Sequence, residues 1–137
     1  MEKLTQIFIV AGVVIEHDGK YLLVQENHPN PKVYGLWNFP AGRVKKGDTI
    51  EKTAIKEAKE ESGYNVELIR KLDIFQESAE VPPQHAFEAR IISGELKWPK
   101  TEILDARWFS FKEIEGMRKK LRGEWILGAI TILEQGN

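Results

Sequence analysis

Three acidic residues near the end of one predicted helix are the side chains best placed to do chemistry. They are Glu57, Glu60 and Glu61. Because a helix turns about 100° per residue, the three carboxylates share an arc of roughly 100° on one helix face. Like charges at this spacing repel each other by on the order of a few tenths of a kcal/mol per pair. A hard divalent cation such as Mg²⁺, which prefers oxygen ligands, would offset that repulsion.

The apolar residues of the same helix predict a buried stripe beside these acids. The stripe consists of Ile50, Ala54, Ile55 and Ala58, and the opposite face carries Lys52, Lys56 and Lys59. An acidic arc that overlaps the edge of a buried stripe favours a cleft over a solvated patch. Acid spacing alone leaves an alternative open, an ordinary charged amphipathic helix, since Glu-rich helices are common.

The wider pattern around the acids is longer and more specific. From Gly42 the chain reads Gly, five residues, Asp48, seven residues, Lys56-Glu57-Ala58, one residue, Glu60-Glu61, one residue, Gly63-Tyr64. This pattern closely resembles the Nudix box, the signature of the Nudix hydrolases. Two residues depart from the family's usual pattern, because Asp48 replaces Glu and Lys56 replaces Arg. Both keep the sign of the charge, but Lys lacks the planar fork that pairs with a carboxylate through two hydrogen bonds.

The resemblance implies a metal-dependent hydrolase. Its metal ligands would be Glu57, Glu60, Glu61 and the backbone carbonyl of Ala41, the residue before the box glycine. The implied cofactor is Mg²⁺, with Mn²⁺ as an alternative. The implied reaction is hydrolysis of a nucleoside diphosphate linked to another group, with a metal-activated water attacking phosphorus in line. Glu60 or Glu61 would take the proton of that water, and sequence does not separate the ligand from the base.

A further acid outside the box is a candidate for catalysis. The segment from Glu102 to Phe109 resembles a second feature of the family, a loop acid some six residues before the Trp of a strand. In several family members this loop acid binds metal or acts as the base, which implies the same part for Glu102. Glu88 and Asp105 are the rival carboxylates.

The flanking segments bear on the substrate. The segments in question are Val10–Val14, Gly19–Val24, Leu36–Gly42 and Ala106–Ser110. They resemble the Nudix subgroup of phosphatases acting on nucleoside di- and triphosphates and on the pyrimidine pyrophosphate precursor of thiamine. Nudix hydrolases of ADP-ribose, nucleotide sugars or dinucleoside polyphosphates share the rest of the sequence pattern and are the alternative. A Nudix-like regulator that binds a nucleotide without cleaving it is a further alternative, against which the intact acids argue.

Two aromatic residues are candidates for binding the substrate. Tyr34 lies in a predicted loop, and Trp37 lies in the extended segment that enters the glycine loop. Either ring could stack on a base. The alternative is that these aromatics belong to the core, as most aromatics do in a chain of this size.

Composition excludes several other classes of protein. The chain has 137 residues, a net charge of −1 and no cysteine. This length suits one domain covering residues 1–137, and the balanced charge gives no sign of a nucleic-acid surface. Without cysteine there are no disulfides or thiolate nucleophiles, which fits a reducing cytoplasm. The apolar run 7–15 is too short to span a membrane. The Nudix resemblance implies a small-molecule nucleotide or organic pyrophosphate as substrate, and a monomer or homodimer, since some family members dimerise.

The order of the predicted elements indicates an α/β protein. Strands are expected at 7–15, 21–25, 64–75, 86–93 and 106–111, and helices are expected from Asp48 to Gly63, from Phe111 to Gly123 and at 125–133. Asp48, followed by Glu51, is the predicted cap of the first helix, and Gly63 is its predicted left-handed end. Ser110 is the predicted cap of the second helix. Strands separated by one central helix and followed by C-terminal helices favour a mixed sheet between helices. The Nudix resemblance implies the same α/β/α sandwich.

Overall fold

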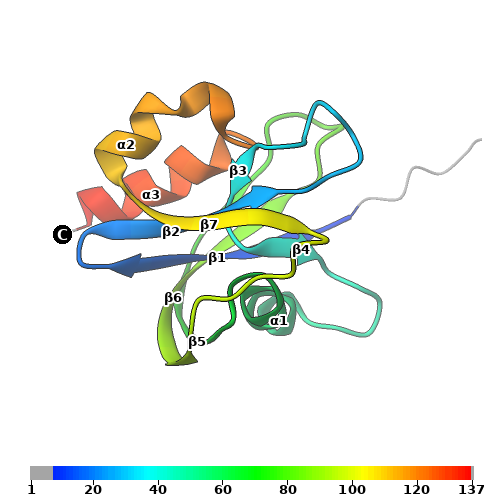
Figure 1. Cartoon of the computed structure of the whole chain (residues 1–137). Helices are drawn as coiled ribbons and strands as arrows, with labels where there is room; N and C mark the ends of the chain where they lie inside the picture. Colours follow the sequence, from blue (N-terminus) through cyan, green and yellow to red (C-terminus); the bar gives the residue numbers. More distant parts are fainter. Residues whose placement is uncertain (1–7, 137) are drawn as a thin grey trace, which may run out of the picture.

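The computed structural model describes residues 8–136 and shows a mixed sheet between two layers of helices (Figure 1). The strands are β1 (Val10–His17), β2 (Lys20–Glu26), β3 (Trp37–Asn38), β4 (Ala41–Arg43), β5 (Tyr64–Phe75), β6 (Gln84–Gly94) and β7 (Ile103–Ser110). The helices are α1 (Ile50–Ser62), α2 (Phe111–Gly116) and α3 (Trp125–Gln135), with a 3₁₀ turn η1 at Arg118–Lys120. The predicted α/β/α sandwich is confirmed.

Strand β1 pairs with three other strands of the sheet. It runs parallel to β6 and antiparallel to β4 and to the start of β2. The order β3-β2-β1-β6-β5 is extended by β4 on β1 and by β7 on β2. In β1, Val14 faces one core while Val13 and Ile15 face the other, and all three are fully buried. Covered faces on both sides explain why this strand reads as a continuous apolar run. The predicted strand began at Ile7, which lies outside the described residues.

Helices cover the two faces of the sheet, as Figure 1 shows with α1 on one side and α2 and α3 on the other. On the α3 side, the ring of Trp125 packs edge-on against Phe39, with 5.1 Å between the ring centroids. The indole N–H of Trp125 donates a 3.0 Å hydrogen bond to Asn38 Oδ1, which satisfies its buried polar group. On the α1 side, Ala54 and Ala58 face the sheet with no exposed surface. The small residues allow α1 to lie close to the strands.

The start of α1 corrects one prediction. Thr49, rather than Asp48, is the N-cap, and its hydroxyl accepts a 3.0 Å hydrogen bond from the N–H of Lys52. Thr49 takes this place because its backbone is extended, with φ of −91° and ψ of 161°, and its carbonyl accepts a helical hydrogen bond from the N–H of Thr53 at 3.1 Å. The predicted end at Gly63 is confirmed, with φ of 84°. A side chain there would also lie 2.3 Å from the carbonyl oxygen of Glu95.

Other element boundaries differ in detail. The helix that begins after Ser110 has the predicted cap but ends at Gly116 instead of reaching Gly123. Strand β5 is continuous over the predicted range, with register shifts between Leu68 and Arg70 and between Lys71 and Asp73. Ile55 was predicted to be buried but is 39% exposed, whereas Thr53 is buried. The buried arc of α1 is therefore centred closer to the acids than the apolar residues indicated.

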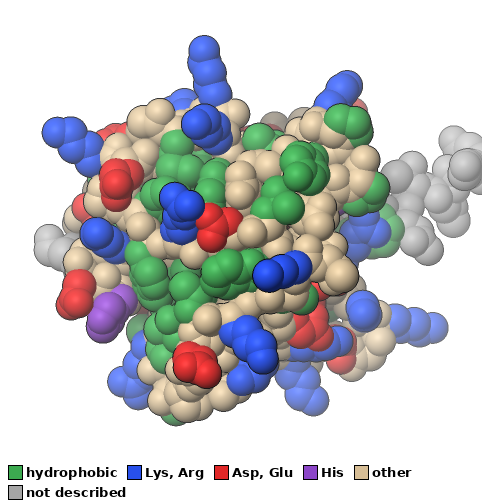
Figure 2. Space-filling model, in the orientation of Figure 1, with side chains coloured by type: hydrophobic (Ala, Val, Ile, Leu, Met, Phe, Trp, Pro, Cys, Tyr) green, Lys and Arg blue, Asp and Glu red, His purple; other side chains and the backbone are tan. Residues whose placement is uncertain are grey.

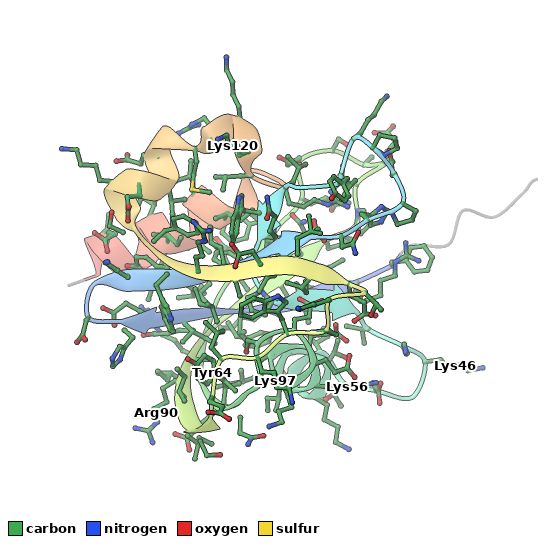
Figure 3. All side chains as sticks on the ribbon, viewed as in Figure 1. Lys46, Lys56, Tyr64, Arg90, Lys97 and Lys120 are labelled. Carbon is green, nitrogen blue, oxygen red and sulfur yellow. The ribbon has the colours of Figure 1, made fainter. Side chains whose placement is uncertain are left out.

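The face of the molecule in Figure 2 combines charged side chains of both signs with apolar ones. In the view of Figure 2, Lys and Arg side chains are scattered over the molecule rather than gathered into one patch. Lys46 and Lys56 extend outward from the loop before α1 and from α1 itself (Figure 3). Within residues 8–136, no helix has the length and apolar character needed to cross a membrane.

Candidate active site

The site begins with a close contact between strand β4 and helix α1. Gly42 of β4 pairs with Ala11 of β1, which anchors the strand in the sheet. A Cβ atom at Gly42 would lie 2.4 Å from Cδ of Glu57. This separation is far below van der Waals contact, so only glycine admits the Glu57 carboxyl group against the strand backbone.

Glu61 reaches the same strand one helical turn later. Its Oε1 accepts a 3.0 Å hydrogen bond from the N–H of Ala41. Side chains at i and i+4 share a helix face, so Glu57 and Glu61 both point from α1 toward β4. The structure thereby brings the predicted ligands Ala41, Glu57 and Glu61 together.

Burial and mutual repulsion make these acids unusually basic. Burial, reinforced by the charges of Glu60 and Glu102, raises the pKa of Glu57 to about 7, with Lys56 and Lys45 acting in the opposite direction. Burial also raises the pKa of Glu61 well above its ordinary value. The charges of Glu57, Glu26 and Glu102 raise it further, while the Ala41 N–H lowers it. Both carboxyl groups therefore lie where their negative charge is poorly solvated, which favours a bound cation.

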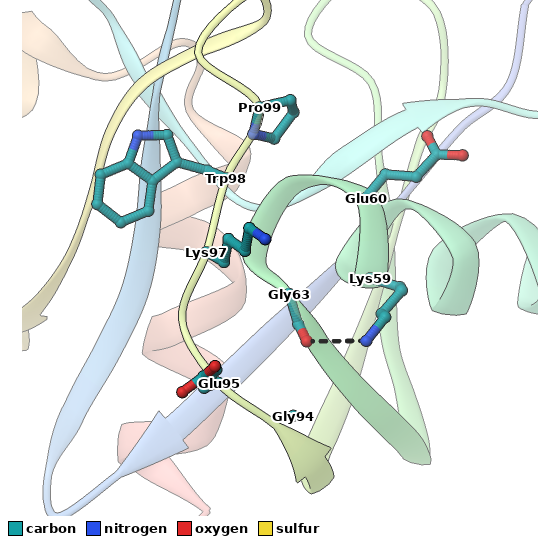
Figure 4. A pocket seen from close by; sticks show the side chains of 8 residues that line it. All are labelled: Lys59, Glu60, Gly63, Gly94, Glu95, Lys97, Trp98 and Pro99. Carbon is teal, nitrogen blue, oxygen red and sulfur yellow. Dashed lines mark hydrogen bonds between the residues drawn. The ribbon is translucent and has the colours of Figure 1, made fainter.

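Glu60 is exposed and lies between these acids and a surface pocket. The pocket has a volume of about 540 Å³ and lies between the end of α1 and the segment 94–99 (Figure 4). Its lining includes Glu60, Lys59, Lys97, Trp98 and Pro99. Lys59 Nζ donates a 3.2 Å hydrogen bond to the carbonyl of Gly63 across this pocket. The pocket therefore offers both charged groups and an aromatic side chain directly beside a box acid.

Glu102 is brought to the site by the turn that precedes β7. Its N–H donates to the carbonyl of Pro99 at 3.0 Å, and its own carbonyl accepts from the N–H of Asn27 at 2.9 Å. The side-chain amide of Asn27 also donates to the carbonyl of Lys100 at 3.0 Å. Asn27 thus holds the turn at the end of β2. The charge of Glu102 raises the pKa values of Glu57 and Glu61, which places it in their electrostatic environment.

The two rivals of Glu102 are engaged elsewhere. Glu88 of β6 pairs with Arg70 at 2.9 Å. Asp105 of β7 pairs with Arg107 at 2.7 Å, and its other oxygen accepts a hydrogen bond from the N–H of Ala106. Neither residue contributes to the raised pKa of Glu57 or Glu61, so Glu102 remains the candidate outside the box.

Glu26 is an acid of this site that sequence reasoning missed. It ends β2, its charge raises the pKa of Glu61, and its Oε2 lies 3.0 Å from Nε of Arg122. Burial raises the pKa of Glu26 itself, while Arg122 and His28 lower it. A charged residue at the end of an apolar strand, next to a loop, was the available signal. The pairing with Arg122 joins residues far apart in the chain and has no sequence signature.

The donor chemistry of the site suits a hard cation. Five carboxylates, those of Glu26, Glu57, Glu60, Glu61 and Glu102, act on one another here. The space at Gly42 accepts the Glu57 carboxyl group beside the backbone of β4. Within the described residues, no three Asp, Glu, His or Cys side chains stand in the geometry of a metal site. Carboxylate oxygens are the type of donor that Mg²⁺ prefers, so these residues fit the ion in type and charge. Their side chains would have to rotate to hold one together.

The two predicted substrate-binding aromatics lie in different environments. Tyr34 is 53% exposed in the loop between β2 and β3. Trp37 is 8% exposed, and its ring packs edge-on against Phe109, with 5.0 Å between the ring centroids. The structure therefore leaves Tyr34 free to meet a ligand and places Trp37 in the core.

Comparisons with known proteins identify the family of the chain. A family model described as NUDIX domain matches residues 7–127. "Putative nudix hydrolase 1" of Caenorhabditis elegans is 33% identical over 120 residues, which cover 85% of this chain and 32% of that protein. "Putative 8-oxo-dGTP diphosphatase" of Bacillus subtilis (strain 168) is 31% identical over 100 residues, which cover 73% of this chain and 64% of that protein. The chain thus spans between a third and two thirds of these relatives.

A solved structure extends the likeness to the whole fold. A NUDIX hydrolase from Nitrosomonas europaea superposes with a TM-score of 0.85 at 26% sequence identity, covering 96% of this chain and 90% of that one. The matching domain, the related sequences and the superposed fold accompany an acidic helix held against a glycine-containing strand. The chain belongs to the Nudix hydrolase family.

Proposed function

We propose that this protein hydrolyses a phosphoanhydride bond in a nucleoside di- or triphosphate, or in another nucleoside diphosphate linked to a further group. One observation carries the proposal. Glu57 and Glu61 are packed against β4 with raised pKa values, and Glu60 and Glu102 add negative charge beside them. Such a site is suited to hold cations that neutralise a polyphosphate.

The residues divide into ligands and proton acceptors. Glu57, Glu60, Glu61 and the carbonyl of Ala41 would hold Mg²⁺, or Mn²⁺ in its place. A bound divalent ion would lower the pKa of a water ligand and offset the charge of the phosphates. The Ala41 N–H fixes one oxygen of Glu61, and the turn at Pro99 fixes the backbone of Glu102. Glu60, Glu61 and Glu102 are the three candidates for the acceptor of the water's proton.

The surroundings offer places for the rest of the substrate. The pocket beside Glu60 has room for a group beyond the phosphates, with the amines of Lys59 and Lys97 in its lining. The exposed ring of Tyr34 could stack on a base. Trp37, packed in the core, has no part in this proposal.

Two other functions are to be tested beside this one. Cleavage of ADP-ribose, nucleotide sugars or dinucleoside polyphosphates would use the same acids, since one fold hosts many activities. A regulator that binds nucleotides without cleaving them is favoured by the departures at Asp48 and Lys56 alone. Asp48 is exposed in the structure and lies outside the cap of α1.

A substrate panel decides among these functions. The purified protein would be incubated with and without Mg²⁺, and the products resolved by chromatography. The panel contains nucleoside di- and triphosphates, 8-oxo-dGTP, thiamine-precursor pyrophosphate, ADP-ribose, a nucleotide sugar and dinucleoside polyphosphates. Metal-dependent release of orthophosphate or pyrophosphate from the simple nucleotides supports the proposal. AMP from ADP-ribose supports the first alternative, and tight nucleotide binding without turnover supports the second.

The setting of the reaction is part of the same proposal. We place it in the cytoplasm, where nucleotide substrates and Mg²⁺ are available, with a monomer or homodimer as the working unit. Neither a membrane nor a nucleic acid is required by the site. Sedimentation of the purified protein at several concentrations measures the assembly state.

A further inference from the structure

Arg122 is held in one position from two directions. It lies between η1 and α3, and its backbone N–H donates a 2.8 Å hydrogen bond to the carbonyl of Trp37. Its side-chain Nε lies 3.0 Å from Oε2 of Glu26. The backbone contact fixes where the side chain begins, and the carboxylate fixes where the guanidinium lies. The residue is therefore preorganised, which reduces the entropy cost of binding a further group.

Glu26 connects this guanidinium to the acids of the site. Its N–H donates to the carbonyl of Leu36, and its carbonyl accepts from the N–H of Gly35, both at 2.8 Å. In the sheet it lies opposite Ile103, the residue that follows Glu102. The next residue, Asn27, binds the backbone of Glu102 directly. Arg122 consequently lies one side chain away from the carboxylates of the candidate active site.

Most of the hydrogen-bonding capacity of Arg122 is unused. A guanidinium carries five N–H donors, and a single carboxylate accepts at most two of them in a paired arrangement. Glu26 is the one acidic partner of this guanidinium among residues 8–136. The side chain is 39% exposed, so the remaining donors are accessible from solvent. An anion with several oxygen atoms could accept hydrogen bonds from these remaining N–H donors.

His28 is a second polar side chain near Glu26. It is exposed and belongs to the electrostatic surroundings of Glu26, whose pKa it lowers together with Arg122. The Nδ1 atom of His28 accepts a 3.0 Å hydrogen bond from the N–H of Asn30. Because Nδ1 accepts this hydrogen bond, Nε2 is the ring nitrogen that can donate. Arg122 and His28 thus both offer N–H donors near Glu26.

We propose that Arg122, positioned by Glu26 and assisted by His28, binds a phosphate oxygen of the substrate beside the catalytic carboxylates. A planar guanidinium matches phosphate through two parallel hydrogen bonds. Lys45 and Lys56 supply positive charge on the Glu57 side of the cluster, and Arg122 supplies it on the Glu26 side. This inference rests on the proposed function and names a residue that selects a polyphosphate substrate.

Steady-state kinetics of matched variants test the inference. Arg122→Gln is expected to raise KM by roughly 10- to 100-fold, the range expected for a lost charge-assisted hydrogen bond, with a smaller change in kcat. Arg122→Lys is expected to recover only part of the loss, because Lys cannot bind two oxygens with a rigid fork. The control is Arg118→Gln, which removes an equal charge nearby from a weak 3.8 Å contact with Glu124. Equal effects of Arg122→Gln and Arg118→Gln would overturn the inference.

A double variant separates phosphate binding from structural support. Arg122→Gln alone leaves Glu26 as a half-buried, unpaired charge, which destabilises the fold by itself. Glu26→Gln combined with Arg122→Gln removes both charges, and its melting temperature should return toward that of the wild type. The raised KM should persist in this double variant. Recovery of both melting temperature and KM would show that the ion pair is only structural.

Direct binding distinguishes failure of this inference from failure of the proposed function. The probe is inorganic pyrophosphate with Mg²⁺, titrated by calorimetry into the wild type, Arg122→Gln, His28→Gln and Arg118→Gln. We expect the largest loss of affinity in Arg122→Gln, a smaller loss in His28→Gln and none in Arg118→Gln. Binding that depends on Arg122 without turnover of any nucleotide would refute the proposed function and support the phosphate contact. Absence of pyrophosphate binding by the wild type would overturn the phosphate contact.

Discussion

The helices on the two faces of the central sheet differ in the side chains they present. On one face, α3 presents the large apolar residues Trp125, Ile126 and Ile130, all fully buried. On the other face, α1 presents Ala54 and Ala58, with acidic residues beyond them on the same side. Helix α3 therefore fills the core with large apolar side chains. Helix α1 carries small side chains toward the sheet, which allows it to lie close to the strands.

This difference separates stability from chemistry. Burial of apolar surface contributes about 25 cal/mol per Å², so the large side chains of α3 stabilise the fold. Burial of a carboxylate costs free energy unless a partner compensates it, so Glu57 and Glu61 oppose folding when no cation is bound. Their raised pKa values report that cost. Replacement of an acid on the α1 face should therefore lower activity, and in the absence of metal it should raise stability rather than lower it.

The largest expected effect comes from neutralising Glu61. Glu61→Gln keeps the shape of the side chain, and its amide oxygen can still accept from the Ala41 N–H. We expect turnover to fall by roughly 10²- to 10⁴-fold, the range typical for loss of a group that acts on a proton or a metal. The measurement is kcat in saturating Mg²⁺ with a substrate from the panel.

The control for this variant lies on the same helix. Glu51 is exposed in the first turn of α1, away from the cluster, and Glu51→Gln should leave turnover within a small factor of normal. Melting curves of both variants check the fold. A near-normal rate for Glu61→Gln would remove the metal-site interpretation.

The opposite face should respond in stability. Trp125→Ala removes a fully buried ring and is expected to lower the free energy of unfolding by about 3–5 kcal/mol, as large-to-small changes in cores do. Denaturant titration measures this loss. Trp125→Phe retains most of the volume and should cost less, mainly through the lost hydrogen bond to Asn38. A loss below about 1 kcal/mol for Trp125→Ala would contradict the assignment of stability to the α3 face.

The acidic face should show a distinctive dependence of stability on pH. The pKa of Glu57 is raised from an ordinary 4.5 to about 7, so its contribution to stability is complete below about 4.5 and is lost as the pH rises through 7. Without metal, the melting temperature should therefore fall as the pH rises from 4.5 to about 7, the two pKa values of Glu57. Glu61, raised in the same direction, adds to the slope.

Melting curves in chelator across this pH range measure the effect. Glu57→Gln should flatten the curve and raise the melting temperature at the alkaline end. Addition of Mg²⁺ at high pH should restore stability to the wild type more than to this variant, because ligand binding to the folded state stabilises it. An unchanged slope in Glu57→Gln would show that this carboxyl group ionises freely.

The smallest expected effect concerns the start of α1. Thr49→Ala should cost about 1 kcal/mol of stability through loss of the hydrogen bond to the Lys52 N–H. Asp48→Ala, one residue earlier and exposed, should change stability by less than about 0.5 kcal/mol. Urea unfolding resolves the two. A larger loss of stability in Asp48→Ala than in Thr49→Ala would show that Asp48 is the N-cap.

Local signals in the sequence were sufficient for the elements that carry them. The left-handed end of α1 at Gly63 and the cap of α2 at Ser110 were both predicted and are present. The cap of α1 was misplaced by one residue because Asp48 and Thr49 are both capping residues. The point at which the backbone turns from extended to helical, at Thr49, decides between them, and the sequence does not record it.

The sequence alone determined that Glu57, Glu60 and Glu61 share one face of α1, because helical geometry converts their spacing into a shared direction. Only the tertiary structure decided which distant residues meet that face. Glu26 and Arg122 come together because strand pairing and the path of the chain into α3 bring β2 and residue 122 side by side. Contacts of this kind depend on the closure of long loops, and no periodicity in the chain records them.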